Sequence, residues 1–218
     1  MTLSFVTPEF NIGGIGTPPL QYFKRGFEIG NPAALPAGYK ELIGVQMNNN
    51  CYYVITGFKL KGSDTIRVSF SVNASCNVFG CYQGASATDN YDLYVSTSSG
   101  SKYLRYGNGT YLSYWSNDNL GKRFDIVFTP TGSTGMPTDS TWTELTFESA
   151  NDMLIGTTSA TSTSSKFVGN FYGHLIVDGR AEFIPVERLS DNEICYYDKI
   201  SGSVYEPIGT TPTSLGYK

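Results

Sequence analysis

The sequence predicts an all-β fold in which two antiparallel sheets pack as a sandwich or close into a barrel. The chain has 16 tyrosines and 13 phenylalanines against 4 methionines, and aromatic side chains suit the pleated surface of a strand. About ten to thirteen short segments bounded by turn residues are predicted as strands. No window of about 11 residues shows the 3.6-residue periodicity of an amphipathic helix.

The strands are expected wherever apolar and polar residues alternate. The clearest example is residues 65–73, in which Ile66, Val68, Phe70 and Val72 share one face. Further strands are predicted at residues 91–96, 102–106, 110–116, 123–129, 142–147 and 152–156. Residues 171–207 then carry the densest run of turn signals. Within it, Asp178-Gly179 predicts a hairpin between strands 171–178 and 181–185, because this dipeptide suits a tight turn between antiparallel strands.

Residues 1–38 differ in composition and predict an extended arm. Five prolines in this stretch leave no room for a regular helix or a central strand. Apolar side chains are nevertheless too frequent for an ordinary disordered tail. The side chains expected to dock are Phe5, Phe10, Leu20, Tyr22, Phe23 and Phe27. The surface that receives them is either the chain's own domain, residues 39–218, or a neighbouring subunit.

Composition excludes some classes of partner. A net charge of −4 argues against nucleic acid, which is bound mainly through basic contacts to phosphate. No run approaches the roughly 20 apolar residues of a membrane helix, and the N-terminus lacks the pattern of a secretory signal.

The four cysteines, Cys51, Cys76, Cys81 and Cys195, fit no zinc spacing, and His174 is the single histidine. We expect buried free thiols in a protein made in a reducing cytoplasm, with a Cys76–Cys81 disulfide as the alternative.

Motifs near both ends of this domain resemble one known family. They are Leu35-Pro36-Ala37-Gly38-Tyr39, Tyr53-Val54-Ile55-Thr56-Gly57, Ile184-Pro185-Val186-Glu187-Arg188, Ile194-Cys195-Tyr196-Tyr197-Asp198 and Leu215-Gly216. Residues 35–216 thereby resemble the concanavalin A-like, laminin-G-like jelly rolls of tailed-phage structural proteins and gut-bacterial surface proteins. The resemblance implies an antiparallel two-sheet jelly-roll sandwich. Two positions depart from it: Ile55 stands where the family commonly has Asp, which suggests a more buried position, and Cys195 replaces a small residue.

No residue is assigned a catalytic role. The glycosidase branch of this fold class carries alternating acids on one strand, so that two carboxylates face one sugar. Here Glu144 and Glu148 lack the intervening acid, since Thr146 stands between them. His174 has no nucleophile pattern beside it, and a hydrogen-bonded strand histidine is the expectation.

A carbohydrate site is the main binding hypothesis. Tyr111 and Trp115 offer aromatic faces, and Asn117 and Asp118 offer hydrogen-bonding groups in the adjoining loop. The alternative is that both aromatic rings pack in the core. Calcium would need Asp89, Asn90, Asp118 and Asp152 to come together in the fold, and we assign neither a metal nor a cofactor.

The resemblance and the arm together imply a non-enzymatic structural component of a tailed-phage virion, made in the host cytoplasm. It would be a capsid decoration, a fibre or a tail-associated protein present in several copies. Its expected partners are other virion proteins, reached through the arm, and a cell-surface glycan; nucleic acid and membrane are not expected. The alternative is a carbohydrate-binding domain of a bacterial surface protein, and a weaker one is a remnant glycosidase.

Overall fold

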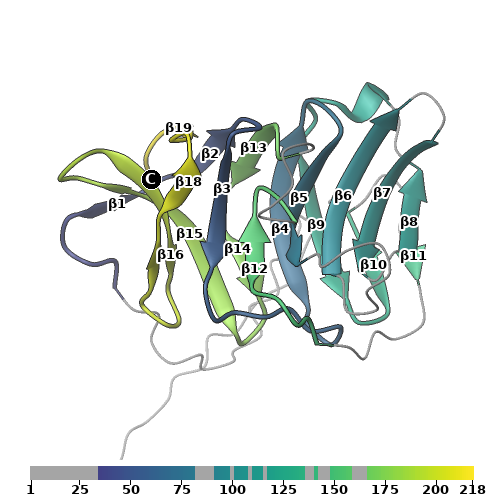
Figure 1. The fold of residues 1–218 in the computed structure, drawn as a ribbon, viewed down its shortest axis with the longest axis horizontal. Coiled ribbons are helices and arrows are strands. Elements are labelled where there is room, and N and C mark those ends of the chain that lie inside the picture. The colour runs from purple at the N-terminus through teal and green to yellow at the C-terminus, as the bar shows by residue number, and fades with distance from the viewer. Residues whose placement is uncertain are drawn as a thin grey trace, which may run out of the picture.

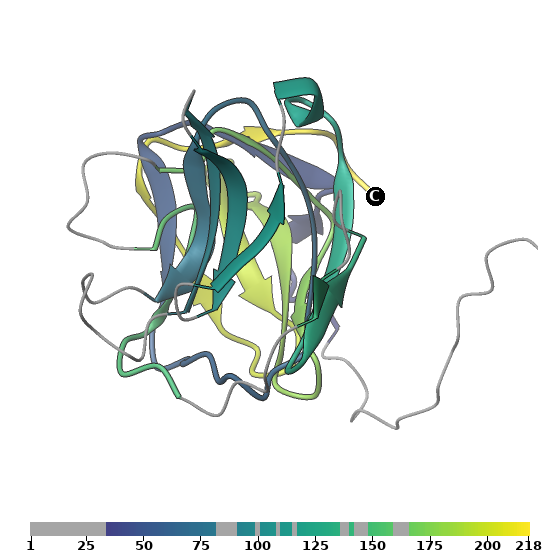
Figure 2. The ribbon, with the colours of Figure 1, turned by 90° about the vertical axis from the view of Figure 1, so that its right-hand side faces the viewer.

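The structure is a computed structural model that describes residues 34–81, 91–98, 101–107, 110–114, 117–135, 140–141, 148–158 and 166–218. Most of these residues lie in strands of two antiparallel sheets, which face each other as the two layers of a β-sandwich (Figures 1 and 2). The all-β, two-sheet prediction is confirmed. A short 3-10 turn, η1 (Asn117–Asn119), precedes β9. Within these ranges, no helix has the length and apolar character needed to cross a membrane.

The larger sheet has twelve strands. Its main path runs β11 (Ser140–Thr141), β10 (Gly132–Thr134), β9 (Phe124–Thr129), β4 (Ile66–Val72), β14 (Leu175–Val177), β15 (Ala181–Arg188), β16 (Glu193–Asp198) and β17 (Val204–Tyr205). Four strands lie off this path: β1 (Tyr39–Glu41) pairs with β15, β13 (Gly169–Tyr172) pairs with β2 and β4, and β19 (Thr213–Ser214) pairs with β2 (Gly44–Met47).

The smaller sheet has seven strands. They are ordered β18 (Pro207–Gly209), β3 (Cys51–Ile55), β12 (Met153–Ile155), β5 (Cys76–Cys81), β6 (Tyr91–Ser98), β7 (Ser101–Gly107) and β8 (Thr110–Tyr114). β17 ends the larger sheet and β18 begins the smaller one, with Glu206 between them. The chain therefore crosses between the layers at this end of the sandwich (left in Figure 1).

The core fills the space between the sheets. In β4, the predicted face of Ile66, Val68, Phe70 and Val72 is buried, which confirms the alternation read from the sequence. Ile55, which stands where the resembling family commonly has Asp, is fully buried as well.

A buried tyrosine pair joins the two sheets. The rings of Tyr53 in β3 and Tyr196 in β16 meet edge to face with centroids 4.8 Å apart. The Tyr53 hydroxyl donates a hydrogen bond to the Ile194 carbonyl at 2.9 Å, so its burial leaves no polar group unsatisfied.

The predicted hairpin is partly right. The chain turns at Asp178-Gly179, where Gly179 has φ +72°, and β14 pairs with β15. The single strand predicted at residues 171–178 is wrong, because it is broken into β13 and β14 at Gly173, where φ is +63°. Phe171 stands opposite Phe70 and Ile176 opposite Arg67, so residues 172–175 face only residues 68 and 69 of β4. The extra residues form a bulge that carries His174.

All four cysteines are free and buried. Cys76 and Cys81 lie at opposite ends of β5, about 16 Å apart for an extended strand, whereas a disulfide needs Cα atoms within about 7 Å. The disulfide alternative is therefore wrong. Burial raises the pKa of Cys51 and Cys76 to about 12 and that of Cys195 to about 11, so these groups are thiols rather than thiolates.

A second apolar cluster lies on the outer face of the larger sheet. Ile184 and Val186 of β15 and Cys195 and Tyr197 of β16 form it, with Leu35, Tyr39 and Val204 packed against them. Neighbouring strand residues point to opposite faces, so Ala181 and Phe183 join the main core instead. Leu35 belongs to the segment assigned to the arm, whose docking residues (Phe5, Phe10, Leu20, Tyr22, Phe23 and Phe27) lie outside the described residues.

Candidate functional site

The candidate site lies where the larger sheet forks. β2 and β13 run side by side as far as Gly44 and Tyr172, and the Gly173 N–H donates to the Ile43 carbonyl at 2.8 Å. Beyond this point the two chains separate and reach different parts of β15. Leu175 of β14 pairs with Phe183, whereas Glu41 of β1 pairs with Val186. His174 and Glu41 therefore face each other across the fork.

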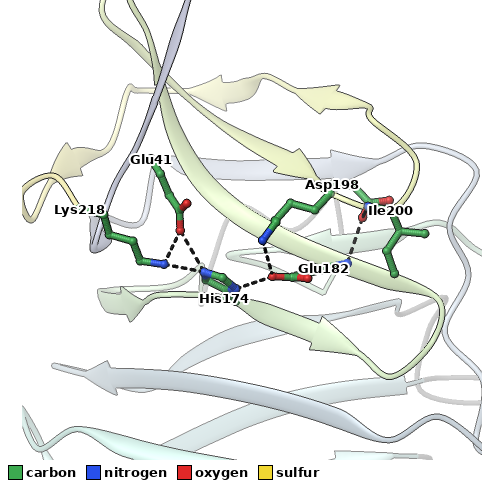
Figure 3. Close-up of polar contacts among 7 residues, drawn as sticks. Glu41, His174, Glu182, Asp198, Ile200 and Lys218 are labelled. Atoms are coloured by element: carbon green, nitrogen blue, oxygen red, sulfur yellow. Dashed lines mark hydrogen bonds and ion pairs between the residues drawn. The ribbon is translucent and has the colours of Figure 1, made fainter. Parts of the chain in front are cut away.

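His174 contacts three charged side chains (Figure 3). Its Nδ1 lies 2.7 Å from Glu182 Oε1, and its Nε2 lies 3.0 Å from Glu41 Oε1 and 2.7 Å from Lys218 Nζ. Lys218 also donates to Glu41, and Lys199 Nζ lies 3.1 Å from Glu182 Oε1. The His174, Glu41 and Glu182 side chains are 22–24% exposed, which makes this a half-buried network rather than a solvated surface pair.

The network is balanced in charge. It holds two carboxylates, Glu41 and Glu182, and two ammonium groups, Lys199 and Lys218, around the imidazole. Partial burial raises the pKa of Glu41, but the hydrogen bonds from Lys218 and His174 outweigh it and lower that pKa below the ordinary value. Glu41 is therefore ionised at neutral pH.

Asp198 fixes the position of Glu182 and Lys199. Its carboxylate is buried and accepts hydrogen bonds from the N–H groups of Glu182 (3.0 Å), Ile200 (3.1 Å) and Ser201 (3.2 Å). The Lys199 N–H donates to the Glu182 carbonyl at 3.0 Å. The turn after β16 is thereby held against β15, and both charged side chains start from a rigid backbone.

The arrangement cross-links neighbouring parts of the sheet through hydrogen bonds and ion pairs. A histidine with a carboxylate on Nδ1 resembles the base and orienting acid of a catalytic pair. Here, however, Lys218 and Glu41 cover the Nε2 atom that a nucleophile would need. The two ring nitrogens also face different carboxylates, so one cation could not bind all three groups. Among the described residues, no cluster of three or more His, Cys, Asp or Glu side chains is arranged to hold a metal.

The sequence identified His174 as hydrogen-bonded but did not identify its partners. Glu182 lies eight residues away across the predicted turn, and the register of that hairpin was a usable signal. Glu41 is 133 residues away, and no local pattern points to it.

Only part of the predicted carbohydrate site falls within the described residues. Tyr111 lies in β8 and Asn117 in η1, but their side chains, like the whole of Trp115, are outside the described residues. Asp118 is exposed in η1. The carbohydrate site stays a prediction.

The calcium candidates and the paired glutamates lie only partly within the described residues. Of the calcium candidates, Asp89 and Asn90 lie outside the described residues, and Asp152 is half-buried just before β12. Glu144 is also outside them, whereas Glu148 is exposed and lies 3.5 Å from Lys61 Nζ.

A second polar cluster adjoins the bulge, on the outer side of β4 and β13. The Tyr172 hydroxyl accepts a hydrogen bond from Asn170 Nδ2 at 3.0 Å and lies 3.2 Å from Ser71 Oγ. The Arg123 guanidinium lies over the Tyr172 ring, 4.8 Å from its centroid, and bonds to Asp125. An aromatic ring beside amide and charged groups is typical of sugar sites, but Arg123 occupies one face of this ring.

Comparison with known proteins does not assign this chain to a family. No family model matches the sequence, and no curated protein matches it. The resemblance to concanavalin A-like jelly rolls stays an expectation that rests on the motifs between residues 35 and 216.

Proposed function

We propose that this protein is a non-enzymatic structural component of a tailed-phage virion, as a capsid decoration, a fibre or a tail-associated protein. Its N-terminal arm docks on another virion protein, and its sandwich, a jelly roll of the concanavalin A-like type, faces outward. The phage assignment is supported by the motif resemblance, and the docking role by how the arm joins the domain.

The anchored root of the arm carries the proposal. Leu35 and Tyr39 pack on the outer apolar cluster of β15 and β16, and the Leu189 N–H donates to the Gly38 carbonyl at 2.8 Å. The 34 residues before Leu35 would reach at most roughly 120 Å if they were fully extended. They include the six apolar and aromatic side chains predicted to dock, which need a surface to cover them. A fixed root with a long apolar segment ahead of it is suited to reaching a partner.

Two truncations test this role. Removal of residues 1–33 keeps Leu35 and Tyr39, so the domain should fold and stay monodisperse but fail to join particles. Removal of residues 1–38 also takes Leu35 from the outer cluster, and this variant should be less stable. Assembly of the shorter truncation onto particles at the wild-type level would contradict the docking role.

A carbohydrate-binding domain is the second candidate, favoured by the Tyr172 cluster beside the bulge. A glycan array of the wild type with Trp115→Ala and Tyr172→Ala separates the possibilities. Binding lost in Trp115→Ala assigns the site to the carbohydrate residues predicted between 111 and 118, and binding lost in Tyr172→Ala assigns it to the outer face of β13. Absence of binding by the wild type contradicts this candidate.

A further inference from the structure

One nitrogen of His174 has two partners that it cannot satisfy in the same protonation state. Nε2 lies 2.7 Å from Lys218 Nζ and 3.0 Å from Glu41 Oε1. An ammonium only donates hydrogen bonds and a carboxylate only accepts them. Nε2 therefore accepts from Lys218 when the ring is neutral and donates to Glu41 when the ring is protonated.

The other nitrogen has no such conflict. Nδ1 lies 2.7 Å from Glu182 Oε1, which also accepts a hydrogen bond from Lys199 at 3.1 Å. An ionised carboxylate at this distance requires a proton on Nδ1. The neutral ring is therefore the Nδ1–H tautomer, with the lone pair of Nε2 directed at Lys218.

We infer that His174 is a proton-operated clasp at the fork of the larger sheet: gain of a proton moves the Nε2 hydrogen bond from Lys218 to Glu41. In the neutral state, His174 and Glu41 together hold Lys218. In the protonated state, the ring cross-links β1 to β15 through Glu41 and Glu182. Lys218 then loses one of its two acceptors and gains a positive neighbour.

Among the described residues, the charged groups in this network come from four parts of the chain. Glu41 belongs to β1, Glu182 to β15, Lys199 to the turn after β16, and Lys218 to the segment that follows β19. Two of these groups are carboxylates and two are ammonium groups, so the charges around the ring balance. The clasp thus depends on which neighbour forms the hydrogen bond with Nε2, and not on a net charge of the network.

The segment held by Lys218 lies along β2 and β1. The Ile43 N–H donates to the Gly216 carbonyl (2.9 Å), the Leu215 N–H to the Gly44 carbonyl (3.0 Å) and the Lys218 N–H to the Glu41 carbonyl (3.2 Å). Weakening of the Lys218 contact should loosen these bonds first. We expect the protection factors of the Leu215 and Lys218 amides to fall about two- to fivefold on protonation, the effect of a partly exposed charged contact.

The first test is NMR of the full chain over about pH 5 to 8, the range in which histidine side chains change charge. Because the chain has one histidine, its imidazole ¹⁵N signals need no assignment. The clasp predicts a protonated Nδ1 and an unprotonated Nε2 at the alkaline end, and protons on both at the acid end. A neutral ring with its proton on Nε2 would overturn it.

The second test compares hydrogen exchange in three variants, with rates corrected for the intrinsic effect of pH. His174→Gln and Lys218→Met should abolish the pH-dependent step at Leu215. Lys40→Met is the matched control, since Lys40 lies 5.2 Å from the Tyr217 ring centroid and should keep the step. A step that persists in Lys218→Met, or that disappears in Lys40→Met, would overturn the clasp.

Discussion

The ion pair between Arg180 and Asp64 offers the sharpest test of what stabilises the sandwich. Arg180 follows the Asp178-Gly179 turn, and its Nη1 lies 2.7 and 2.6 Å from the two carboxylate oxygens of Asp64. Its Nη2 donates to the Lys59 carbonyl at 2.7 Å. The Asp64 side chain is only 3% exposed, whereas Arg180 is 30% exposed. The substitution Arg180→Met keeps much of the side-chain volume and leaves a buried carboxylate without its cation.

The magnitude follows from burial and from the partners that remain. Loss of one member of a buried ion pair costs about 3–5 kcal/mol. Asp64 keeps the hydrogen bond from the Lys61 N–H (2.7 Å), and Arg180 is partly solvated, so we expect the lower end, about 3 kcal/mol. For a domain of this size, the melting temperature should fall by roughly 6–12 °C.

Thermal and urea unfolding measure the change, with Arg67→Met as the matched control. Arg67 makes an equally regular pair with Asp178, at 3.0 and 2.9 Å, but the two side chains are 50% and 38% exposed. Removal of such a surface pair should cost less than about 1 kcal/mol. Equal losses in Arg180→Met and Arg67→Met would refute the reasoning, because burial would then make no difference.

Three further predictions follow from single positions. Gly209→Ala should lower the free energy of unfolding by roughly 2 kcal/mol or more, because φ is +95° and the new Cβ atom would lie 1.8 Å from a backbone oxygen. Gly179→Ala is the control: φ is +72° but the space around it is open, so the loss should be about 1 kcal/mol. Equal losses for the two variants in urea unfolding would contradict this prediction. Iodoacetamide at about pH 8 should label the native protein slowly, because burial raises the pKa of Cys51 and Cys76 to about 12. After denaturation it should label all four cysteines. Labelling of the native protein at the rate of an exposed free thiol would contradict this prediction. Glu41→Gln should lower the free energy of unfolding at about pH 7 but not near pH 3. The pKa of Glu41 is lowered in the folded protein, so its carboxylate contributes stability above the unfolded pKa, and this contribution is lost as pH falls through the folded pKa. A stability difference between wild type and variant that is the same at both pH values would contradict this prediction.

Local patterns explain how much of the fold the sequence predicts. The alternation in residues 65–73 identifies the buried face of β4, because side chains on a strand alternate between its two faces. The turn at Asp178-Gly179 is also local, since a glycine there adopts the left-handed conformation freely.

The fork was not predictable in the same way. Gly173-His174 interrupts an apolar run, and a glycine inside a strand pattern is a sign of a bulge, but the local sequence does not show which strand each half pairs with. The break depends on β2 and β15, which pair with successive parts of the edge opposite β4: β2 with residues 169–172 and β15 with residues 175–177. The network at His174 likewise depends on Glu41 and Lys218, which the topology brings in from the two ends of the domain.

The most direct test of the docking proposal is to find which chain the arm touches. A photo-crosslinking amino acid at Phe23 would report this in assembled particles, and the same group at exposed Ile208 of β18 would serve as the control. The proposal predicts that Phe23 cross-links to another virion protein and that Ile208 does not. Cross-links from Phe23 confined to its own sandwich, while the protein is present on particles, would contradict it.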